Sequence, residues 1–138
     1  MDLFAGHGSV DLQIRDRILY VEGSGPWNIE SVKKAGETFN PLISQLSGKP
    51  WAVLVVLHGD PIYVPAAAEY LIEAIKRERE LGRVATAIMV DKANTPSFAK
   101  RHLSEIYKKA GCEFEFFSQQ EEATWWLVKQ ISLADGRL

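Results

Sequence analysis

The stretch that decides the fold is Trp51-Ala-Val-Leu-Val-Val-Leu57, followed by His58-Gly59-Asp60-Pro61-Ile62-Tyr63. An uninterrupted apolar run of this length is typical of a strand that is buried on both faces of a sheet. In open α/β sheets, ligands bind just beyond the carboxyl ends of such strands. We therefore expect the residues after Leu57 to form a loop that leads into a helix, and we look for function there.

The rest of the chain alternates between strand and helix patterns around this central strand. Strands are expected at 10–14, 18–21, 51–57, 84–90 and 112–117, and helices at 29–46, 64–81, 96–110 and 118–131. The opening pair is typical of an antiparallel hairpin, whereas the later β-α units imply parallel strands with right-handed crossovers. The fold class is therefore α/β, with a central mixed sheet in the order β-β-α-β-α-β-α-β-α and helices packed against it. We expect a single domain, 1–138, with a core at about 10–131.

Three local signals give sharper expectations. Gly23-Ser24-Gly25-Pro26 should end the second strand in a turn, and the lack of a third glycine at the required spacing favours a flexible turn over a dinucleotide-binding loop. Pro41 removes a backbone donor from the first helix, so we expect a kink or a break between Glu37 and Pro41. Ser118 and Glu121 form a capping box that should begin the last helix.

The composition argues against several classes of protein. A net charge of −2 and a pI near 5.9 do not suit a nucleic-acid binder that neutralises phosphates. The longest apolar run, 52–57, is far shorter than the ~20 residues of a membrane span. The start, Met1-Asp2-Leu3-Phe4, lacks the basic segment and apolar core of a signal peptide. The single cysteine, Cys112, cannot form an internal disulfide. We expect a cytoplasmic protein.

Residues spread along the chain resemble those of STAS-like proteins, and more closely those of the SpoIIAA-like branch. The matching pieces are the opening hairpin, the pattern Gly23-x-Gly25-x-Trp27-Asn28, the strand at 51–57 and the ending Phe116-Phe117-x-x-x-x-Glu122-Ala123-x-x-Trp126-Leu127. Together they cover about 10–131, which is nearly the whole chain. The resemblance implies a single STAS-like domain that acts without a cofactor, as a non-enzymatic module that binds a protein or a small ligand.

The chain departs from the STAS pattern at the residue that carries the switch. In switch proteins of that family, a Ser or Thr after the third strand is phosphorylated by a partner kinase, which controls binding to a regulator of transcription. The corresponding segment here, Gly59-Asp60-Pro61-Ile62-Tyr63-Val64-Pro65, contains no Ser or Thr. We therefore expect an interaction module that binds a protein partner through this loop but lacks the phosphorylation site of anti-sigma-factor antagonists. The alternative is a protein that binds a small apolar or anionic metabolite or a lipid.

Five residues around this loop form the candidate binding site. His58 and Asp60 are the best-placed polar pair for contact with a ligand or partner. No third metal ligand lies at a suitable spacing, and the simpler interpretation is that His58 ends the strand while Asp60 caps the next turn. Ile62, Tyr63 and Phe98 are expected to line an apolar cleft beside them. We predict no metal site and no catalytic residue.

Three further side chains have both a structural and a functional interpretation. Trp125 points away from the apolar stripe of the last helix, so that with Val128 it could form the interface of a homodimer or bind a partner. Alternatively, the tail at 133–138 folds over it. Cys112 is better explained as a buried, inert thiol than as a nucleophile. His102 is expected at the edge of the apolar stripe of its helix, near Phe98.

Overall fold

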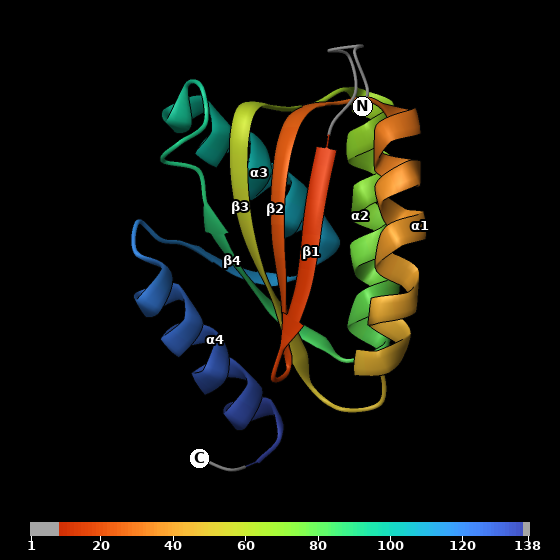
Figure 1. Cartoon of the computed structure of the whole chain (residues 1–138), viewed down its shortest axis with the longest axis vertical. Coiled ribbons are helices and arrows are strands. Elements are labelled where there is room, and N and C mark those ends of the chain that lie inside the picture. Colours follow the sequence, from red (N-terminus) through yellow and green to blue (C-terminus); the bar gives the residue numbers. More distant parts are fainter. Residues whose placement is uncertain (1–8, 137–138) are drawn as a thin grey trace.

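The computed structural model describes residues 9–136, and in this part of the chain four helices surround one five-stranded sheet (Figure 1). The strands are β1 (Ser9–Arg15), β2 (Ile18–Trp27), β3 (Trp51–Tyr63), β4 (Arg83–Met89) and β5 (Glu113–Phe116). The helices are α1 (Ile29–Leu46), α2 (Pro65–Glu80), α3 (Pro96–Ala110) and α4 (Gln120–Ala134). The start of the chain, on which we based the expectation of no signal peptide, lies outside the described residues.

The sheet follows the order of the chain, β1-β2-β3-β4-β5, so that β3 lies at its centre. β1 is antiparallel to β2, and every other neighbouring pair is parallel. This is the mixed sheet that the sequence predicts, and the order of elements is the predicted one. The α/β fold class is confirmed.

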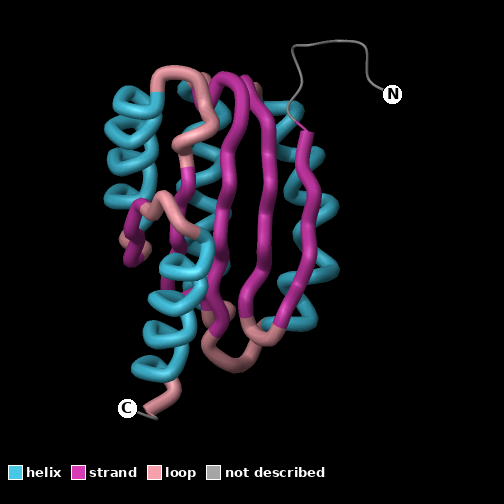
Figure 2. Tube along the Cα trace, turned by 60° about the vertical axis from the view of Figure 1, so that its left-hand side comes forward, coloured by secondary structure: helices cyan, strands magenta, loops and turns pink. Residues whose placement is uncertain are grey.

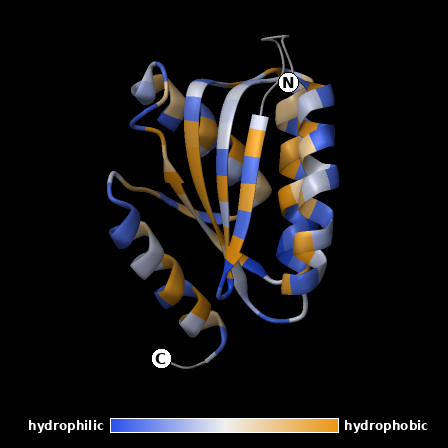
Figure 3. Ribbon diagram, viewed as in Figure 1, coloured by the Kyte–Doolittle hydropathy of each residue, from blue (hydrophilic) through white to orange (hydrophobic). Residues whose placement is uncertain are grey.

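The two faces of the sheet are covered unequally. α1, α2 and α3 pack on one face, whereas α4 packs on the other, against β3 and β4 (Figure 1, Figure 2). Because successive strand residues point to opposite faces, β3 directs Val53 and Leu57 toward the three-helix side and Ala52 and Leu54 toward α4. The apolar run of β3 is therefore buried on both sides. Figure 3 shows the contrast with α1 and α2, which combine hydrophobic and hydrophilic residues.

β2 and β3 are longer than predicted. The predicted turn at Gly23-Ser24-Gly25-Pro26 and the predicted loop after Leu57 are both wrong, because these segments continue as strands and pair with each other as far as Trp27 and Tyr63. The register shifts between Gly25 and Trp27. Such a shift accommodates a residue that cannot donate a backbone hydrogen bond, as the intervening proline cannot. The candidate residues from His58 to Tyr63 thus lie on a strand.

α1 is a continuous helix through Pro41, so the predicted break is wrong. A proline inside a helix removes one hydrogen bond and crowds the preceding turn. Buried apolar residues lie on both sides of it, Val32 before and Ile43 after, and each packs in the core beneath the helix. Their burial holds the two halves of α1 on the same face of the sheet.

α4 begins differently from the prediction. Its N-cap is Gln119, and no side chain caps the helix, so the predicted capping box of Ser118 and Glu121 is wrong. The backbone N–H of Phe117 donates to the carbonyl of Ile88, at 2.9 Å. This bond joins the residue that follows β5 to β4. The helix then begins one residue later than the capping pattern implies.

Candidate functional site

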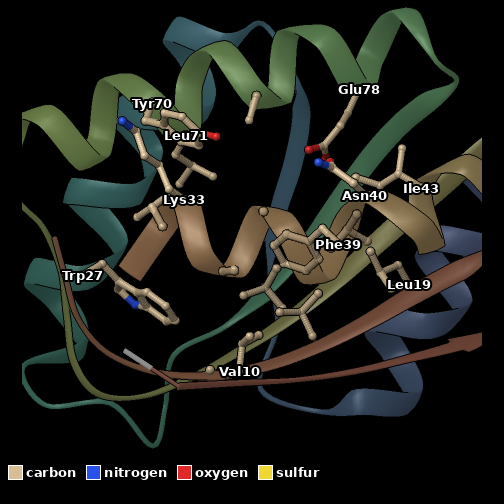
Figure 4. A pocket seen from close by; sticks show the side chains of 18 of the residues that line it. Val10, Leu19, Trp27, Lys33, Phe39, Asn40, Ile43, Tyr70, Leu71 and Glu78 are labelled. Carbon is tan, nitrogen blue, oxygen red and sulfur yellow. The ribbon is translucent and has the colours of Figure 1, made fainter. Parts of the chain in front are cut away.

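A cavity of about 380 Å³ lies between α1, α2 and the sheet. Its walls are mainly apolar, and Figure 4 shows side chains from both helices and from the strands pointing into it. The apolar residues that line it include Val10, Leu19, Val32, Phe39, Ile43 and Val55. Ligand sites in proteins commonly have volumes of roughly 300–1,000 Å³. Because protein interiors are otherwise close-packed, a space of this size is the leading candidate for a binding site.

Small residues keep this space open. Gly36 of α1 and Ala74 of α2 both line the cavity. A Cβ atom added to Gly36 would meet the hydroxyl of Tyr70 at 3.7 Å, which is an ordinary contact distance. A larger side chain at this position would therefore extend into the cavity instead of being excluded by the backbone.

Charged residues border the cavity where it opens to solvent. Lys33 and Glu37 of α1 and Arg77 of α2 line it and are exposed. The ammonium group of Lys33 lies 5.9 Å from the centre of the Tyr70 ring, close enough for a cation–π attraction. The opening thus lies along the two helices, and its rim is polar while the interior is apolar.

Trp27 closes one end of the cavity and is 4% exposed. Its ring lies against two glycines of β2. A Cβ on Gly23 would lie 2.9 Å from Cζ2 of the indole, and one on Gly25 would lie 3.0 Å from Nε1. The absence of side chains at these two glycines therefore lets the indole ring pack directly against the backbone of β2. Within residues 9–136, the indole N–H has no hydrogen-bond partner, which costs roughly 1–3 kcal/mol for a buried donor.

A row of stacked rings leads from Trp27 to the surface of the protein. Trp27 stacks on Tyr63 with 5.8 Å between ring centres, Tyr63 on His102 with 6.2 Å, and His102 on Phe98 with 5.6 Å. Tyr63 lines the cavity, and burial raises the pKa of its hydroxyl well above the ordinary value. This phenol therefore remains protonated near neutral pH and can act as a hydrogen-bond donor.

The opposite end of the cavity is polar and contains Glu78 (Figure 4), and Arg83, which also lines the cavity, is hydrogen-bonded to it. Arg83 is 6% exposed, and its Nη1 donates to Oε1 of Glu78 at 2.7 Å. Nη2 and Nε donate to the hydroxyl of Thr86 at 2.7 and 3.2 Å. Tyr107 lies beside this pair, with its ring centre 5.9 Å from Cζ of Arg83. The guanidinium group is thus held in a fixed position beneath an apolar space.

Each of the two groups Arg83 and Tyr107 keeps its proton, so that Arg83 is charged and Tyr107 is neutral. Burial alone lowers the pKa of Arg83, but the combined effects of Glu78, which attracts and hydrogen-bonds the guanidinium, and of Tyr107 and Cys112 raise the pKa above its ordinary value. Burial raises the pKa of the Tyr107 hydroxyl, against the attraction of Arg83. The site therefore holds one cation paired with one carboxylate, beside a neutral phenol.

His58 and Asp60 do not line this cavity. Nε2 of His58 lies 2.6 Å from Oε2 of Glu22, on the neighbouring strand. Oδ1 of Asp60 accepts a hydrogen bond of 2.9 Å from the side-chain amide of Asn94. Each polar group thus has its own partner, and the two do not form a joint site.

The three predicted apolar residues are divided between the cavity and the surface. Tyr63 lines the cavity, whereas Ile62 is 40% exposed and Phe98 is 42% exposed. Sequence reasoning identified Tyr63 but missed Trp27, Glu78 and Arg83. Two glycines that precede a tryptophan at alternating positions, as Gly23 and Gly25 precede Trp27, are the signal that could have indicated a ring packed against a strand.

The other predicted residues lie as follows. Trp125 is 79% exposed and Val128 is also exposed, so that the described part of the tail does not cover them. Cys112 is buried, as expected, with Sγ 3.5 Å from the hydroxyl of Thr86. His102 stacks on Phe98, also as expected.

Within 9–136, no three His, Cys, Asp or Glu side chains gather closely enough to hold a metal ion. None of the four helices in the same part of the chain combines the length and apolar character needed to cross a membrane.

Comparisons with known proteins support the fold. No protein-family model matches the sequence, and no curated protein sequence matches it. Among solved structures, the chain is similar to an uncharacterised protein of the DUF3478 family with a SpoIIAA-like fold, from Shewanella loihica PV-4. The TM-score is 0.60 at 18% identity, over 92% of this chain and 98% of that chain. The SpoIIAA-like fold that the sequence resemblance predicts is therefore confirmed.

Proposed function

We propose that this protein binds an elongated, mainly apolar small molecule in the cavity between α1, α2 and the sheet, without transforming it. The observation that carries the proposal is a cavity of about 380 Å³ with mainly apolar walls. Burial of apolar surface drives binding at such a site. The few polar groups at the ends of the cavity would fix the orientation of the ligand.

The shape of the cavity supports an elongated ligand. On α1, the first residue that lines it is Val32 and the last is Ile43. At 1.5 Å per residue, that stretch of helix is about 16 Å long. Trp27 lies at one end and Glu78 near the other (Figure 4). A chain-like or flat molecule matches this space better than a compact one.

Binding without chemistry is supported by the state of the polar groups. Tyr63 is the hydroxyl-bearing residue of the Gly59–Tyr63 segment, where related switch proteins are phosphorylated, and it lines the cavity beneath the helices. His58 and Asp60 are each paired with a different neighbour. We propose on these grounds that the protein neither catalyses a reaction nor serves as a phosphorylation switch.

The test is displacement of a neutral fluorescent probe, N-phenylnaphthylamine, by decanol. The wild-type protein should bind the probe and release it when decanol is added. Gly36→Leu should abolish probe binding, because the new side chain fills the cavity. Thr38→Leu is the matched control, because Thr38 is exposed on the same helix and does not line the cavity. A wild-type protein that binds neither compound, or a Gly36→Leu variant that binds as well as the control, would refute the proposal.

A protein partner that binds at the carboxyl end of β3 is the second candidate function. It is favoured by the exposure of Ile62 and Phe98. Ile62 precedes Tyr63 on β3, and Phe98 stacks on His102, which accepts a part-buried hydrogen bond from Tyr63. A photoreactive benzoylphenylalanine at position 98 should then crosslink a discrete partner in cells. The same group at the exposed Glu69 of α2 is the control. Equal labelling from both positions would remove this candidate.

A further inference from the structure

The polar end of the cavity is electrically neutral although it is built from charged groups. Arg83 and Glu78 form an ion pair with 2.7 Å between Nη1 and Oε1, and the side chains of both are largely buried. Both residues line the cavity. Two opposite charges this close largely cancel each other for any group placed beside them.

The pair still offers hydrogen bonds to a ligand. A guanidinium carries five N–H groups. The hydrogen bonds to Glu78 and Thr86 use three of them, one each from Nε, Nη1 and Nη2. Two N–H groups remain, and because Arg83 lines the cavity beside Tyr107, an acceptor in the cavity can compete for them. The carboxylate of Glu78 uses Oε1 for Arg83, so that Oε2 can accept a hydrogen bond from a hydroxyl.

A charged head group would be unfavourable at this place. A carboxylate would gain from Arg83 but would face the carboxylate of Glu78, and an ammonium would meet the reverse arrangement. In both cases the head group would also lose its hydration without gaining a net opposite charge. An uncharged group that both donates and accepts hydrogen bonds avoids this cost.

We infer that the ligand carries an uncharged, hydrogen-bonding head group, such as an alcohol, which lies against Arg83 and Glu78 while its apolar body extends toward Trp27. The inference rests on the proposed function and specifies its ligand class. The aromatic residues at the far end, Trp27 and Tyr63, provide the apolar surface for the body of the ligand.

Two other arrangements make different predictions. A carboxylate could lie at the rim, where Lys33 and Arg77 are exposed. Alternatively, an acceptor could pair with the buried N–H of Trp27, which has no partner in residues 9–136. In the first arrangement the protein prefers an acid to an alcohol. In the second arrangement, with the acceptor at Trp27, a substitution of Glu78 leaves the relative affinity for an acid and an alcohol unaltered.

The experiment compares decanol with decanoate as competitors of N-phenylnaphthylamine at about pH 8, where decanoate is ionised. Decanol should bind the wild-type protein more tightly. Glu78→Gln removes the negative charge beside Arg83, so that decanoate should gain about tenfold in affinity relative to decanol. Glu80→Gln is the matched control, because this carboxylate is exposed at the end of the same helix and does not line the cavity, and it should alter the ratio by less than about threefold.

A second variant covers the case in which Glu78→Gln does not fold. The double substitution Glu78→Leu with Arg83→Met replaces the ion pair by apolar groups, a change that buried pairs often tolerate. It should retain the naphthylamine probe but lose about tenfold in decanol affinity. A wild-type preference for decanoate, an unchanged ratio in Glu78→Gln, or unchanged decanol binding in the double variant would overturn the inference. Failure of the wild-type protein to bind the probe would instead overturn the proposed function.

Discussion

The backbone N–H of Tyr63 donates to Nε2 of His102 at 3.1 Å. This bond joins the end of β3 to the middle of α3, beside the stacking of the two rings. It also fixes the tautomer, because Nε2 must be unprotonated to accept and the proton of the neutral ring then lies on Nδ1. The position of Tyr63 at the cavity wall therefore depends on a side chain from another element.

Loss of this acceptor should lower stability. His102→Phe keeps a ring in the stack but leaves the Tyr63 N–H without its partner, so that the free energy of unfolding should fall by about 1–2 kcal/mol. His102→Gln, which retains a side-chain acceptor, is the comparison and should cost less. Urea denaturation monitored by circular dichroism measures both. If the two variants are equally stable, the hydrogen bond contributes little and the ring contact dominates.

Gly36, the glycine of α1 that lines the cavity, provides a substitution that should raise stability rather than lower it. Gly36→Ala should raise the free energy of unfolding by up to about 1 kcal/mol, because alanine favours a helix interior more than glycine does. The added Cβ meets no atom closer than the Tyr70 hydroxyl at 3.7 Å. Urea denaturation again gives the value. A loss of stability would show that the backbone of α1 lies closer to α2 than described.

Replacement of either glycine of β2 by alanine should instead lower the stability of the protein. A Cβ on Gly25 would lie 1.9 Å from the backbone oxygen of Asp60, and a backbone atom cannot move aside as a flexible side chain can. Gly25→Ala should therefore destabilise the protein by about 3 kcal/mol or more. Gly23→Ala should cost less, since its Cβ would meet the ring of Trp27 at 2.9 Å and the ring can shift. Thermal unfolding should rank the wild type above Gly23→Ala, and Gly23→Ala above Gly25→Ala. The reverse order would contradict the packing described for β2 and β3.

The buried tyrosines should make the protein sensitive to alkali. The pKa of Tyr107 is raised in the folded protein, chiefly by burial, whereas in the unfolded chain it is near 10. The folded state therefore holds this proton at a pH where the unfolded state releases it. Stability should be complete below about pH 10 and should fall above it, by about 1.4 kcal/mol per pH unit for one such phenol.

Tyr107→Phe tests this pH dependence. The variant should lose stability less steeply than the wild type above about pH 10, and the two proteins should show parallel behaviour between neutral pH and the onset of the loss. Tyr20, which is only half-buried, provides the control as Tyr20→Phe. Identical alkaline slopes for wild type and Tyr107→Phe would show that this phenol does not titrate on unfolding as described.

The sequence predicted the order of elements well because the apolar periodicity that defines them is local. The apolar run at 51–57 and the hairpin before it led to the correct sheet. The continuation of β3 to Tyr63 was missed because Gly59 and Pro61 are typical turn residues. In the structure, Gly59 has a φ of +65° and still pairs with Gly25 across the ladder.

The candidate site was harder to predict because a cavity is a property of packing between distant segments. Its walls come from α1, α2, α3 and four strands, and its one local signal in the sequence is a glycine, Gly36, inside a helix. Arg83 was missed for a related reason. A charged residue at the start of a strand is usually exposed, and its partner Glu78 lies across a turn, at the end of the preceding helix.

The exposed face of α4 gives the last prediction. Trp125 is 79% exposed, and a large apolar side chain so open to water is often an interface anchor. We expect a homodimer in solution in which Trp125 and Val128 meet their counterparts. Trp125→Ala should then shift the mass measured by size-exclusion chromatography with light scattering toward that of a monomer. Lys129→Ala, an exposed neighbour on the same helix, should leave the mass unchanged. A monomeric wild-type protein at high concentration would exclude the dimer and leave Trp125 available to a different partner.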